Sequence, residues 1–402
     1  MNKQLYKLSC RTFQLGMKIA NYVIPYHMPQ YIEGENSILR LANIVKGRGW
    51  HNFLIVSDPT ILSLGLLDHM LHSFDEAHIS YTLFTNVEKN PTSKNVEEGY
   101  QCYQQHHCQA LIGFGGGAAI DCAKAIGAKA VHPKKSIAQL QGILKVHAKI
   151  PPFIAIPTTA GTGSETTLAS VIIDANTHHK ASINDPFLIP TFAVLDPVLT
   201  EGLPPQVTAT TGMDALCHAI ESYTNHTYNT ELEDVLAKEA VRLIHDNLYK
   251  AYLDGHDLNA RSNMQRAAFF AGRSFTRGCV GYVHAIGHTL GGLYGVPHGN
   301  AMSIILPHVL RQYGTSVEKR LAELADICGI DGKNIHEQSQ NFITWIEEMK
   351  TQMQIPTNAS MIKEEDMPQI IKWAMKEANP LYPCVEVWQR EDFEKALKTI
   401  KG

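Results

Sequence analysis

The first half of the chain alternates between short apolar runs and longer amphipathic stretches. The short runs are FLIVSDP (53–59), ISYTLFTNV (79–87), ALIGFGGG (110–117), FIAIP (153–157) and FAVLDP (192–197). Runs that are apolar at consecutive positions are typical of strands buried on both faces. Before the first run and between the later ones, residues 37–46, 61–74, 93–106 and 118–131 show helical spacing of apolar residues. This alternation predicts a doubly wound, largely parallel, Rossmann-like α/β domain.

Three other segments in this half have weaker patterns. Residues 1–30 predict an irregular or helical lead-in, and residues 22–32 contain two prolines, which allow only an edge or irregular strand. Residues 171–174 and 180–184, joined by a polar turn at 175–179, predict a hairpin.

Strand patterns stop after Pro204 and Pro205. The following stretches at 212–224, 231–253 and 258–275 are amphipathic with helical spacing. A chain of 402 residues is long for a single core. We therefore expect an α/β domain at 1–204, with 1–20 as a lead-in extension, and an all-α domain at 205–402.

The composition narrows the classes of partner. A net charge of −4, with 18% charged residues, gives no electrostatic signature for nucleic acid or an anionic membrane. No segment approaches the roughly 20 apolar residues of a membrane span. Eight scattered cysteines without a CxxC pair indicate free thiols in a reducing, cytoplasmic environment.

The N-terminal segment differs in charge from the rest of the chain. Residues 1–32 contain no Asp or Glu but four basic residues, which is the charge pattern of a transit peptide. One Arg, one Ser and no continuous apolar core before residue 20 favour a surface segment of a cytoplasmic protein instead.

Two loops have the residue types of a nucleotide site. Gly115, Gly116 and Gly117 separate a strand from a helix, so backbone N–H groups and the helix N-terminus can approach a phosphate. The spacing is not G-x-G-x-x-G, and a tight packing turn is the alternative. The loop at 157–167 carries Thr158, Thr159, Thr162 and Ser164, which could line a phosphate or ribose or form a polar turn.

Histidines gather between Gly281 and Gly299. His284 and His288 are one helical turn apart, and His298 follows a Gly-Val-Pro turn that should end the helix. Asp214 and His218 have the same spacing upstream. A carboxylate with imidazoles suits Fe(II), Zn(II) or a similar ion, whereas ordinary packing histidines are the alternative. Cys217 should point away from this face into the core.

Four motifs together resemble the iron-containing (group III) alcohol dehydrogenases. They are GGGAAIDCAK (115–124), PTTAGTGSE (157–165), TGMDALCHAIESY (211–223) and HAIGH…PHG (284–299). The resemblance, which runs from about residue 25 to the end, implies a dehydroquinate synthase-like fold with the active site in the cleft between an NAD-binding α/β domain and a helical domain. It also implies metal ligands at Asp214, His218, His284 and His298, with His288 near the substrate and the nicotinamide.

The sequence departs from the family in two places. Ala118 stands where the family usually has Ser, so we expect weaker pyrophosphate contacts without loss of binding. The first 20 or so residues have no counterpart in compact members.

The cofactor expected from the resemblance is NAD. Asp58 ends a strand where a carboxylate would bond the ribose 2′-hydroxyl and repel a 2′-phosphate. Lys180 could neutralise phosphate or contact the nicotinamide ribose. The residues expected to bind NAD are Asp58, Asn90, Gly115, Gly116, Gly117, Ala118, Asp121, Thr158, Thr159, Thr162 and Lys180.

The predicted function is interconversion of a primary alcohol or diol and its aldehyde. Fe²⁺, with Zn²⁺ possible, would act as a Lewis acid and favour hydride transfer, while His288 carries the proton or only packs. Alternatives are a hydroxyacid–oxoacid transhydrogenase with retained NAD, a zinc polyol dehydrogenase or dehydroquinate synthase, and a degenerate structural member. We expect a homodimer or higher homo-oligomer without nucleic-acid or membrane partners.

Overall fold

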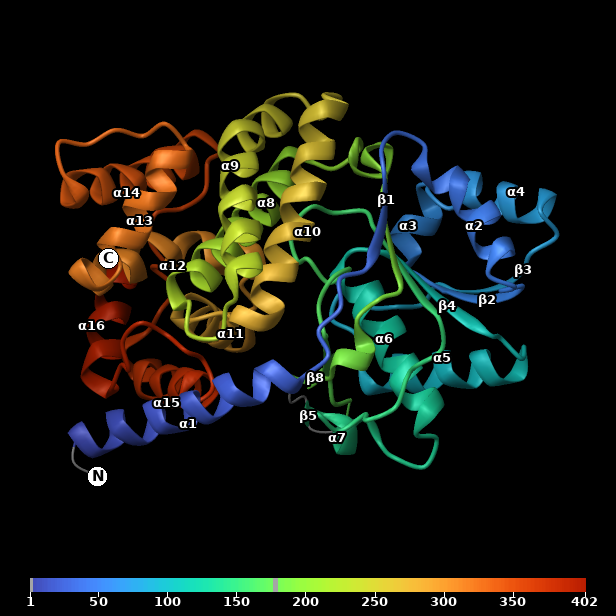
Figure 1. Cartoon of the computed structure of the whole chain (residues 1–402), viewed down its shortest axis with the longest axis horizontal. Coiled ribbons are helices and arrows are strands. Elements are labelled where there is room, and N and C mark those ends of the chain that lie inside the picture. Colours follow the sequence, from blue (N-terminus) through green and yellow to red (C-terminus); the bar gives the residue numbers. More distant parts are fainter. Residues whose placement is uncertain (1–2, 176–179) are drawn as a thin grey trace. The chain divides into compact units, whose positions relative to one another are not determined.

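A computed structural model describes residues 3–175 and 180–402 (Figure 1). The chain forms two compact units. One comprises Pro25–Leu203 with His256–Gln265, and the other comprises Met1–Ile24, Pro204–Gly255 and Arg266–Gly402. We call them the α/β unit and the helical unit, and we describe each by itself.

The α/β unit is built on a parallel sheet of six strands in the order β1-β9-β6-β4-β2-β3. The strands are β1 (Gln30–Glu33), β2 (Asn52–Val56), β3 (Ser80–Phe84), β4 (Ala110–Gly115), β6 (Phe153–Pro157) and β9 (Phe192–Leu195). The five apolar runs all form strands of this sheet, and the proline-containing segment supplies the edge strand β1. The predicted doubly wound α/β fold is therefore confirmed.

Alternate side chains of the central strands enter two different cores. Leu54 and Val56 of β2 pack into one hydrophobic cluster, and Phe53 and Ile55 pack into the other. All four are fully buried. The consecutive apolar pattern thus reflects helices that cover both faces of the sheet.

The helices of this unit follow the predicted segments, with one difference. They are η1 (Ser37–Arg40), α2 (Leu41–Gly47), α3 (Pro59–Ser63), α4 (Asp68–Glu76), α5 (Ser93–Gln105), α6 (Gly117–Val131), α7 (Ile137–Leu140), η2 (Pro186–Leu188) and η3 (Pro197–Thr200). The single helix expected at 61–74 is wrong. It is interrupted near Gly65, whose φ of 67° lies in the left-handed region.

A small second sheet has the order β5-β8-β7, with β5 at Gly142–Ile143, β7 at Ala169–Ile173 and β8 at Lys180–Asn184. Strands β7 and β8 pair antiparallel, as the predicted hairpin requires. Most of the predicted polar turn, residues 176–179, lies outside the described residues.

The helical unit has no strand among its described residues. Its elements are α1 (Lys3–Val23), α8 (Pro205–Asn225), α9 (Glu231–Leu253), α10 (Leu258–Gly278, whose first residues are grouped with the α/β unit), α11 (Tyr282–Tyr294), α12 (His298–Tyr313), η4 (Gly314–Ser316), α13 (Glu318–Ile327), α14 (Ile335–Gln352), η5 (Glu364–Asp366), α15 (Met367–Ala378) and α16 (Arg390–Lys401). None of the described helices has the length and apolar character needed to cross a bilayer.

The N-terminal segment is a helix that belongs to the helical unit, whereas the sequence-based division places it with the α/β domain. Arg11 of α1 donates to the carbonyl of Cys384 over 2.9 Å, and Gln14 donates to the carbonyl of Tyr382 over 2.8 Å. These contacts span more than 360 residues of sequence, so local pattern could not reveal them.

Candidate metal centre and nucleotide loop

Three helices of the helical unit bring together a carboxylate and three imidazoles. Asp214 and His218 lie one turn apart on α8, His284 lies on α11, and His298 is the first residue of α12. Helix α11 ends at Gly295 in the left-handed conformation, and the chain returns through Pro297, as the sequence predicts. One ligand atom from each of the four side chains lies within 4.8 Å of the others.

Asp214 is the centre of this group. Its Oδ1 lies 3.4 Å from Nε2 of His298, 3.7 Å from Nε2 of His284 and 4.0 Å from Nε2 of His218. Within the described residues, Oδ1 of Asp214 and Nε2 of His284 are buried without a hydrogen-bond partner. Buried polar atoms are normally satisfied, so converging unpaired oxygen and nitrogen atoms fit a divalent cation.

Asp214 and His298 have the protonation that suits a cation, whereas His284 does not. Burial opposes ionisation of Asp214, but the imidazoles of His218, His298 and His284 outweigh burial and lower its pKa. Burial lowers the pKa of His298 to about 3, which keeps that ring neutral. An ionised carboxylate and neutral imidazole nitrogen are the forms that bind metal. Burial opposes protonation of His284, but the carboxylates of Glu221 and Asp214 outweigh burial and raise the pKa of His284 to about 9, so a metal would have to displace a proton from this ring.

Glu221 supports the group from α8, the helix that also carries Asp214 and His218. Its Oε2 accepts a hydrogen bond from Nδ1 of His284 over 2.5 Å, and its Oε1 accepts from the backbone N–H of Val283 over 2.7 Å. Sequence reasoning missed Glu221. Its spacing of seven from Asp214, which is two helical turns on one face, was the available signal.

His288 lies beside the group but is not one of its four members. Its ring centroid is 5.2 Å from that of His298, and its Nδ1 donates to Oε1 of Glu377 on α15 over 2.7 Å. Tyr382 donates to the same carboxylate oxygen over 3.0 Å. The side chain of His288 remains 36% exposed. Glu377 was also missed, because no local pattern connects it to His288.

Cys217 is fully buried beside these residues, as predicted. Its thiol contacts the carbonyl of Met302 over 3.5 Å. All eight cysteines are free thiols.

In the α/β unit, the two predicted loops meet at the carboxyl ends of β4 and β6. Gly115 is opposite Pro157 in the register, and the N–H of Thr158 donates to the carbonyl of Gly115 over 3.0 Å. A Cβ on Gly117 would lie 3.0 Å from atoms of Thr162. A Cβ on Gly116 would lie 3.8 Å from atoms of Thr159. The three glycines and the three threonines therefore form one surface.

This surface has the features of a pyrophosphate cradle. Helix α6 begins at Gly117, and its N-cap Gly116 provides no side-chain cap for the first N–H groups. The chain runs from β2 outward to β3 and then returns to β4 on the other side of β2. Ligands bind at such a reversal of strand order, and helix N-terminal N–H groups bind anions. Ala118 lies in this first turn.

Asp58 lies against the glycine loop. Its Oδ1 caps α3 by accepting from the N–H groups of Thr60 and Ile61 over 2.9 and 3.1 Å. Its Oδ2 would be 3.4 Å from a Cβ on Gly115. The carboxylate thus has a structural role as a cap and lies next to the expected nucleotide loop.

Two other predicted residues are paired with each other. Nζ of Lys180 donates to Oδ1 of Asn90 over 3.4 Å, which connects β8 to the loop after β3. Both lie in the α/β unit.

Asp121 holds the threonine loop against α6. Its carboxylate accepts from Oγ of Ser164 over 2.5 Å and from the N–H of Val171 over 2.9 Å, and burial raises its pKa. Lys124, one turn later and fully buried, donates to the carbonyls of Thr167 and Ala169 over 2.8 and 2.9 Å. Both oxygens of Asp121 therefore have protein partners, and Lys124 adds a positioning contact that the sequence did not predict.

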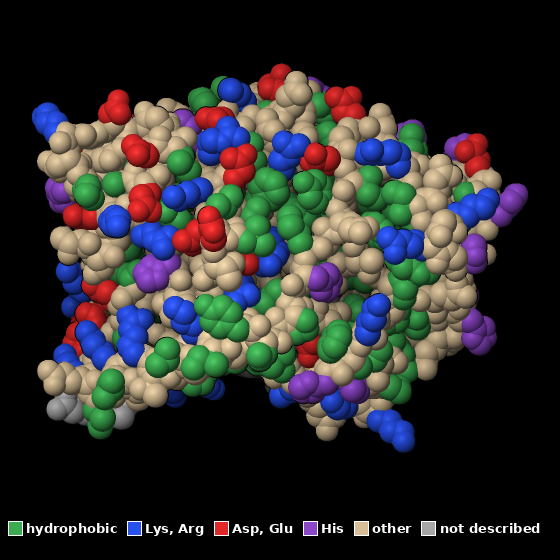
Figure 2. Space-filling model, in the orientation of Figure 1, with side chains coloured by type: hydrophobic (Ala, Val, Ile, Leu, Met, Phe, Trp, Pro, Cys, Tyr) green, Lys and Arg blue, Asp and Glu red, His purple; other side chains and the backbone are tan. Residues whose placement is uncertain are grey.

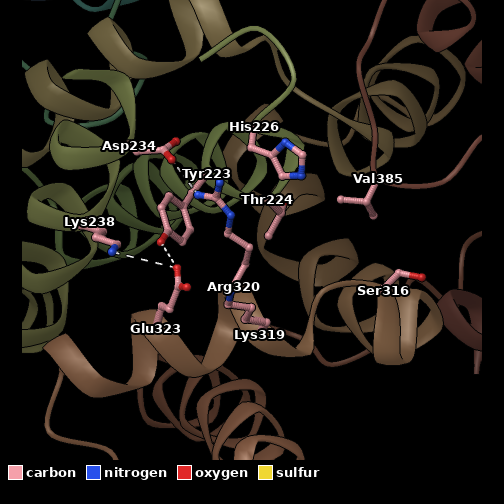
Figure 3. Close-up of a pocket in the computed structure, with 10 residues that line it drawn as sticks. All are labelled: Tyr223, Thr224, His226, Asp234, Lys238, Ser316, Lys319, Arg320, Glu323 and Val385. Carbon is pink, nitrogen blue, oxygen red and sulfur yellow. Dashed lines mark hydrogen bonds and ion pairs between the residues drawn. The ribbon is translucent and has the colours of Figure 1, made fainter. Parts of the chain in front are cut away.

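A separate cavity of about 490 Å³ lies in the helical unit (Figure 3). Its charged groups pair with one another, since Arg320 lies 2.7 Å from Asp234 and Lys238 lies 3.9 Å from Glu323. Arg320 also covers the ring of Tyr223 at 4.3 Å. The members of the metal group do not line this cavity.

Comparison with known proteins connects both sites to one family. Residues 29–197 match the family described as iron-containing alcohol dehydrogenase, and residues 208–400 match the Fe-containing alcohol dehydrogenase family, C-terminal. The chain is 35% identical over 393 residues to alcohol dehydrogenase 4 of Schizosaccharomyces pombe, covering 94% of this chain and 92% of that protein. It is 36% identical to the 1,3-propanediol dehydrogenase of Klebsiella pneumoniae, covering 86% and 90%.

Solved structures agree with this relationship. A 1,3-propanediol oxidoreductase superimposes with a TM-score of 0.89 at 33% identity, covering 94% of this chain and 99% of that one. A sulfoacetaldehyde reductase from Bifidobacterium kashiwanohense, in complex with NAD⁺, gives a TM-score of 0.85 at 27% identity, covering 94% and 99%.

Proposed function

The chain belongs to the iron-containing alcohol dehydrogenase family, and we propose that it interconverts a primary alcohol or diol and its aldehyde with NAD and a divalent metal. The observation that carries this proposal is the convergence of Asp214, His218, His284 and His298 from three helices. The family relationship makes iron(II) the proposed metal, and zinc suits the same donor set.

The metal and the cofactor would supply the chemistry, and the chain would position them. A divalent ion at the four ligands would polarise the substrate oxygen, while NAD at the glycine loop would take up or return the hydride. The cradle of Gly115, Gly116 and Gly117, which side chains would fill, is consistent with binding of the pyrophosphate.

His288 is the proposed proton carrier. Glu377 accepts from its Nδ1, so Nε2 is the nitrogen that would exchange a proton with substrate or solvent. The exposed part of the ring supports this role, because a proton relay needs access to water. Glu221 would act differently, by fixing the tautomer and orientation of His284 so that Nε2 is presented to the metal.

The proposed substrate class comes from the relatives. Proteins similar to this chain include a 1,3-propanediol dehydrogenase and an NAD-dependent methanol dehydrogenase of Bacillus methanolicus, the latter 35% identical over 376 residues. Both names describe oxidation of primary alcohols. For NAD, the support is the position of Asp58 beside the glycine loop, where its charge would oppose a 2′-phosphate.

The test begins with protein purified anaerobically. Its metal content is measured, and the protein is then screened with NAD⁺ against primary alcohols and diols and with NADH against their aldehydes. Stoichiometric iron with NAD-dependent turnover is the expected result. Copurified NAD(H) that does not exchange, with turnover only when an oxoacid is supplied, would instead identify a transhydrogenase. Light scattering of the same preparation tests the proposed homo-oligomer.

A further inference from the structure

Helix α1 has its polar side turned toward the protein. Its buried residues are Cys10, Gln14 and Asn21. Gln14 donates to the carbonyls of Pro380 and Tyr382 over 3.2 and 2.8 Å, and Arg11 donates to the carbonyls of Cys384 and Val385 over 2.9 and 2.6 Å. Hydrogen bonds to backbone carbonyls, rather than burial of large apolar side chains, therefore hold this helix to the helical unit.

The apolar side of α1 faces solvent. Five aliphatic side chains of α1 are 56% to 82% exposed, namely Leu5, Leu8, Leu15, Ile19 and Val23, and the rings of Tyr22 and Phe13 are 69% and 42% exposed. At 100° per residue, the five aliphatic positions form one stripe opposite the face that carries Cys10, Gln14 and Asn21. Figure 2 shows hydrophobic side chains along this helix. Exposing so many large apolar groups on one face is unfavourable in water, so the stripe indicates an interaction surface.

The charges on α1 are of one sign. It contains Lys3, Lys7, Arg11 and Lys18 and no acidic residue, although the whole chain has a net charge of −4. Lys3 pairs with Glu391 over 3.2 Å. By helical spacing, Lys7, Arg11 and Lys18 lie along one flank of the stripe. A partner surface that covers the stripe should therefore be apolar where it contacts the stripe and negatively charged where it faces the basic flank.

The expectation of no membrane partner rests on the net charge of the whole chain, and the local charge of α1 points the other way. We infer that α1 lies on an anionic lipid surface, with the stripe in the acyl region and Lys7 and Lys18 at the level of the phosphates. An amphipathic helix binds such an interface in the membrane plane, because apolar burial and attraction to anionic lipid add. Lysine stems are long enough to place the charge among headgroups while their methylenes stay in the apolar layer.

A second copy of α1 fits the stripe less well. Antiparallel pairing of two such helices would bring basic flanks against basic flanks without an acidic partner, and like charges at that distance repel. Thr12 and Gly16 also interrupt the side that a partner helix would have to pack against. Lipid chains are fluid and tolerate both residues.

The test uses the full-length protein and sedimentation with vesicles. Wild type should bind vesicles of phosphatidylcholine with phosphatidylglycerol, should bind phosphatidylcholine alone weakly, and should dissociate at high salt. Leu8→Asp with Leu15→Asp should abolish binding. Lys7→Gln and Lys18→Gln should each weaken it about fivefold, the effect of roughly 1 kcal/mol per basic residue near an anionic surface. Leu253→Asp, at an exposed leucine on α9, is the matched control and should bind as wild type.

Each other outcome overturns the inference. Three such outcomes are that the wild type does not bind the anionic vesicles, that the Leu8→Asp/Leu15→Asp protein binds them as strongly as the wild type, and that the Leu253→Asp control loses as much binding as the Leu8→Asp/Leu15→Asp protein. An oligomer that light scattering detects and that Leu8→Asp/Leu15→Asp dissociates, without vesicle binding, would identify the stripe as a contact between copies. The lysine variants keep the test decisive if the double leucine variant does not fold.

Discussion

Nδ1 of His284 and Oε2 of Glu221 are 2.5 Å apart, and both side chains are almost completely buried. The contact joins helix α11 to helix α8 and leaves Nε2 of His284 directed toward Asp214. A carboxylate that binds the distal nitrogen of a metal-ligating histidine fixes its tautomer and increases its basicity.

Replacing Glu221 should therefore weaken metal binding without removing a ligand. We expect Glu221→Gln to lower metal affinity about 10- to 100-fold, the usual effect of losing such a partner. Metal titration followed by mass spectrometry measures it. Glu239→Gln, at a carboxylate on α9 that pairs with Arg242, is the control. Unchanged affinity in Glu221→Gln would leave Glu221 with only its contact to Val283.

Removing a ligand should have a larger effect. His284→Ala or His298→Ala should lose metal and turnover while NAD binding to the α/β unit persists. Added metal should raise the unfolding temperature of the wild type, because a ligand that binds only the folded state stabilises it. This increase should disappear in the variants and persist in His308→Ala, whose ring on α12 contacts the carbonyl of Thr357 instead. Normal metal content in either ligand variant contradicts the assignment.

Substitution of His288 distinguishes a role in metal binding from a role in proton transfer. His288→Gln should retain metal and reduce alcohol oxidation by about 10²–10⁴-fold, the usual contribution of a general acid–base group. The pH–rate profile should change shape as well. Glu377→Gln should produce a smaller loss, because it removes the anchor of Nδ1 and keeps the ring. Loss of metal from His288→Gln would make His288 a ligand, and full activity with an unaltered profile would make it a packing residue.

Cofactor choice can be tested at Asp58 in two steps, because the carboxylate also caps α3. Asp58→Asn keeps a capping oxygen and removes the charge, whereas Asp58→Gly removes both. We expect both variants to narrow the preference for NAD over NADP by about 5- to 150-fold, from roughly 1–3 kcal/mol of charge repulsion. Relative kcat/KM values for the two cofactors measure this. If the preference is the same in both variants as in wild type, Asp58 does not face the ribose.

The glycine loop should not tolerate a side chain at Gly115. Its φ of 145° is poorly accessible to other residues, and a Cβ there would lie 3.0 Å from that of Ala119. Gly115→Ala should therefore move the loop and raise the Kd for NAD about tenfold or more, a cost of roughly 1.4 kcal/mol. Calorimetry measures it. Gly47→Ala, where the added carbon would have no atom within 4 Å apart from its chain neighbours and the backbone of its own helix, should bind as wild type.

Patterns that extend over only a few residues could be interpreted from the sequence alone. The consecutive apolar runs predict strands buried on both faces, and the structure confirms them as strands of one parallel sheet. The turn at Gly295 and Pro297 predicts the end of α11 and the return of the chain. The spacing of Asp214 and His218 predicts their common helical face. Each inference depends on the helical or strand period, which acts over a few residues.

Comparison with known proteins contributes a different kind of information. The four motifs resemble one family, and comparison of whole chains shows membership of that family. The proposed role of each site residue is still a prediction. The structure brings the four predicted ligands together and places Asp58 beside the glycines, which is the arrangement that the predictions require.

Sequence patterns predict the strands of the parallel sheet, the hairpin, the helices at 212–224, 231–253 and 258–275, and the residue types at both candidate sites. Tertiary structure decided which side chains support them. Glu221 meets His284 across 63 residues, and Glu377 meets His288 across 89. The polar face of α1 is buried against carbonyls near the C-terminus, so its apolar face is exposed. Such contacts depend on how helices pack rather than on any repeat along the chain, because a side chain's period fixes its face but not its partner.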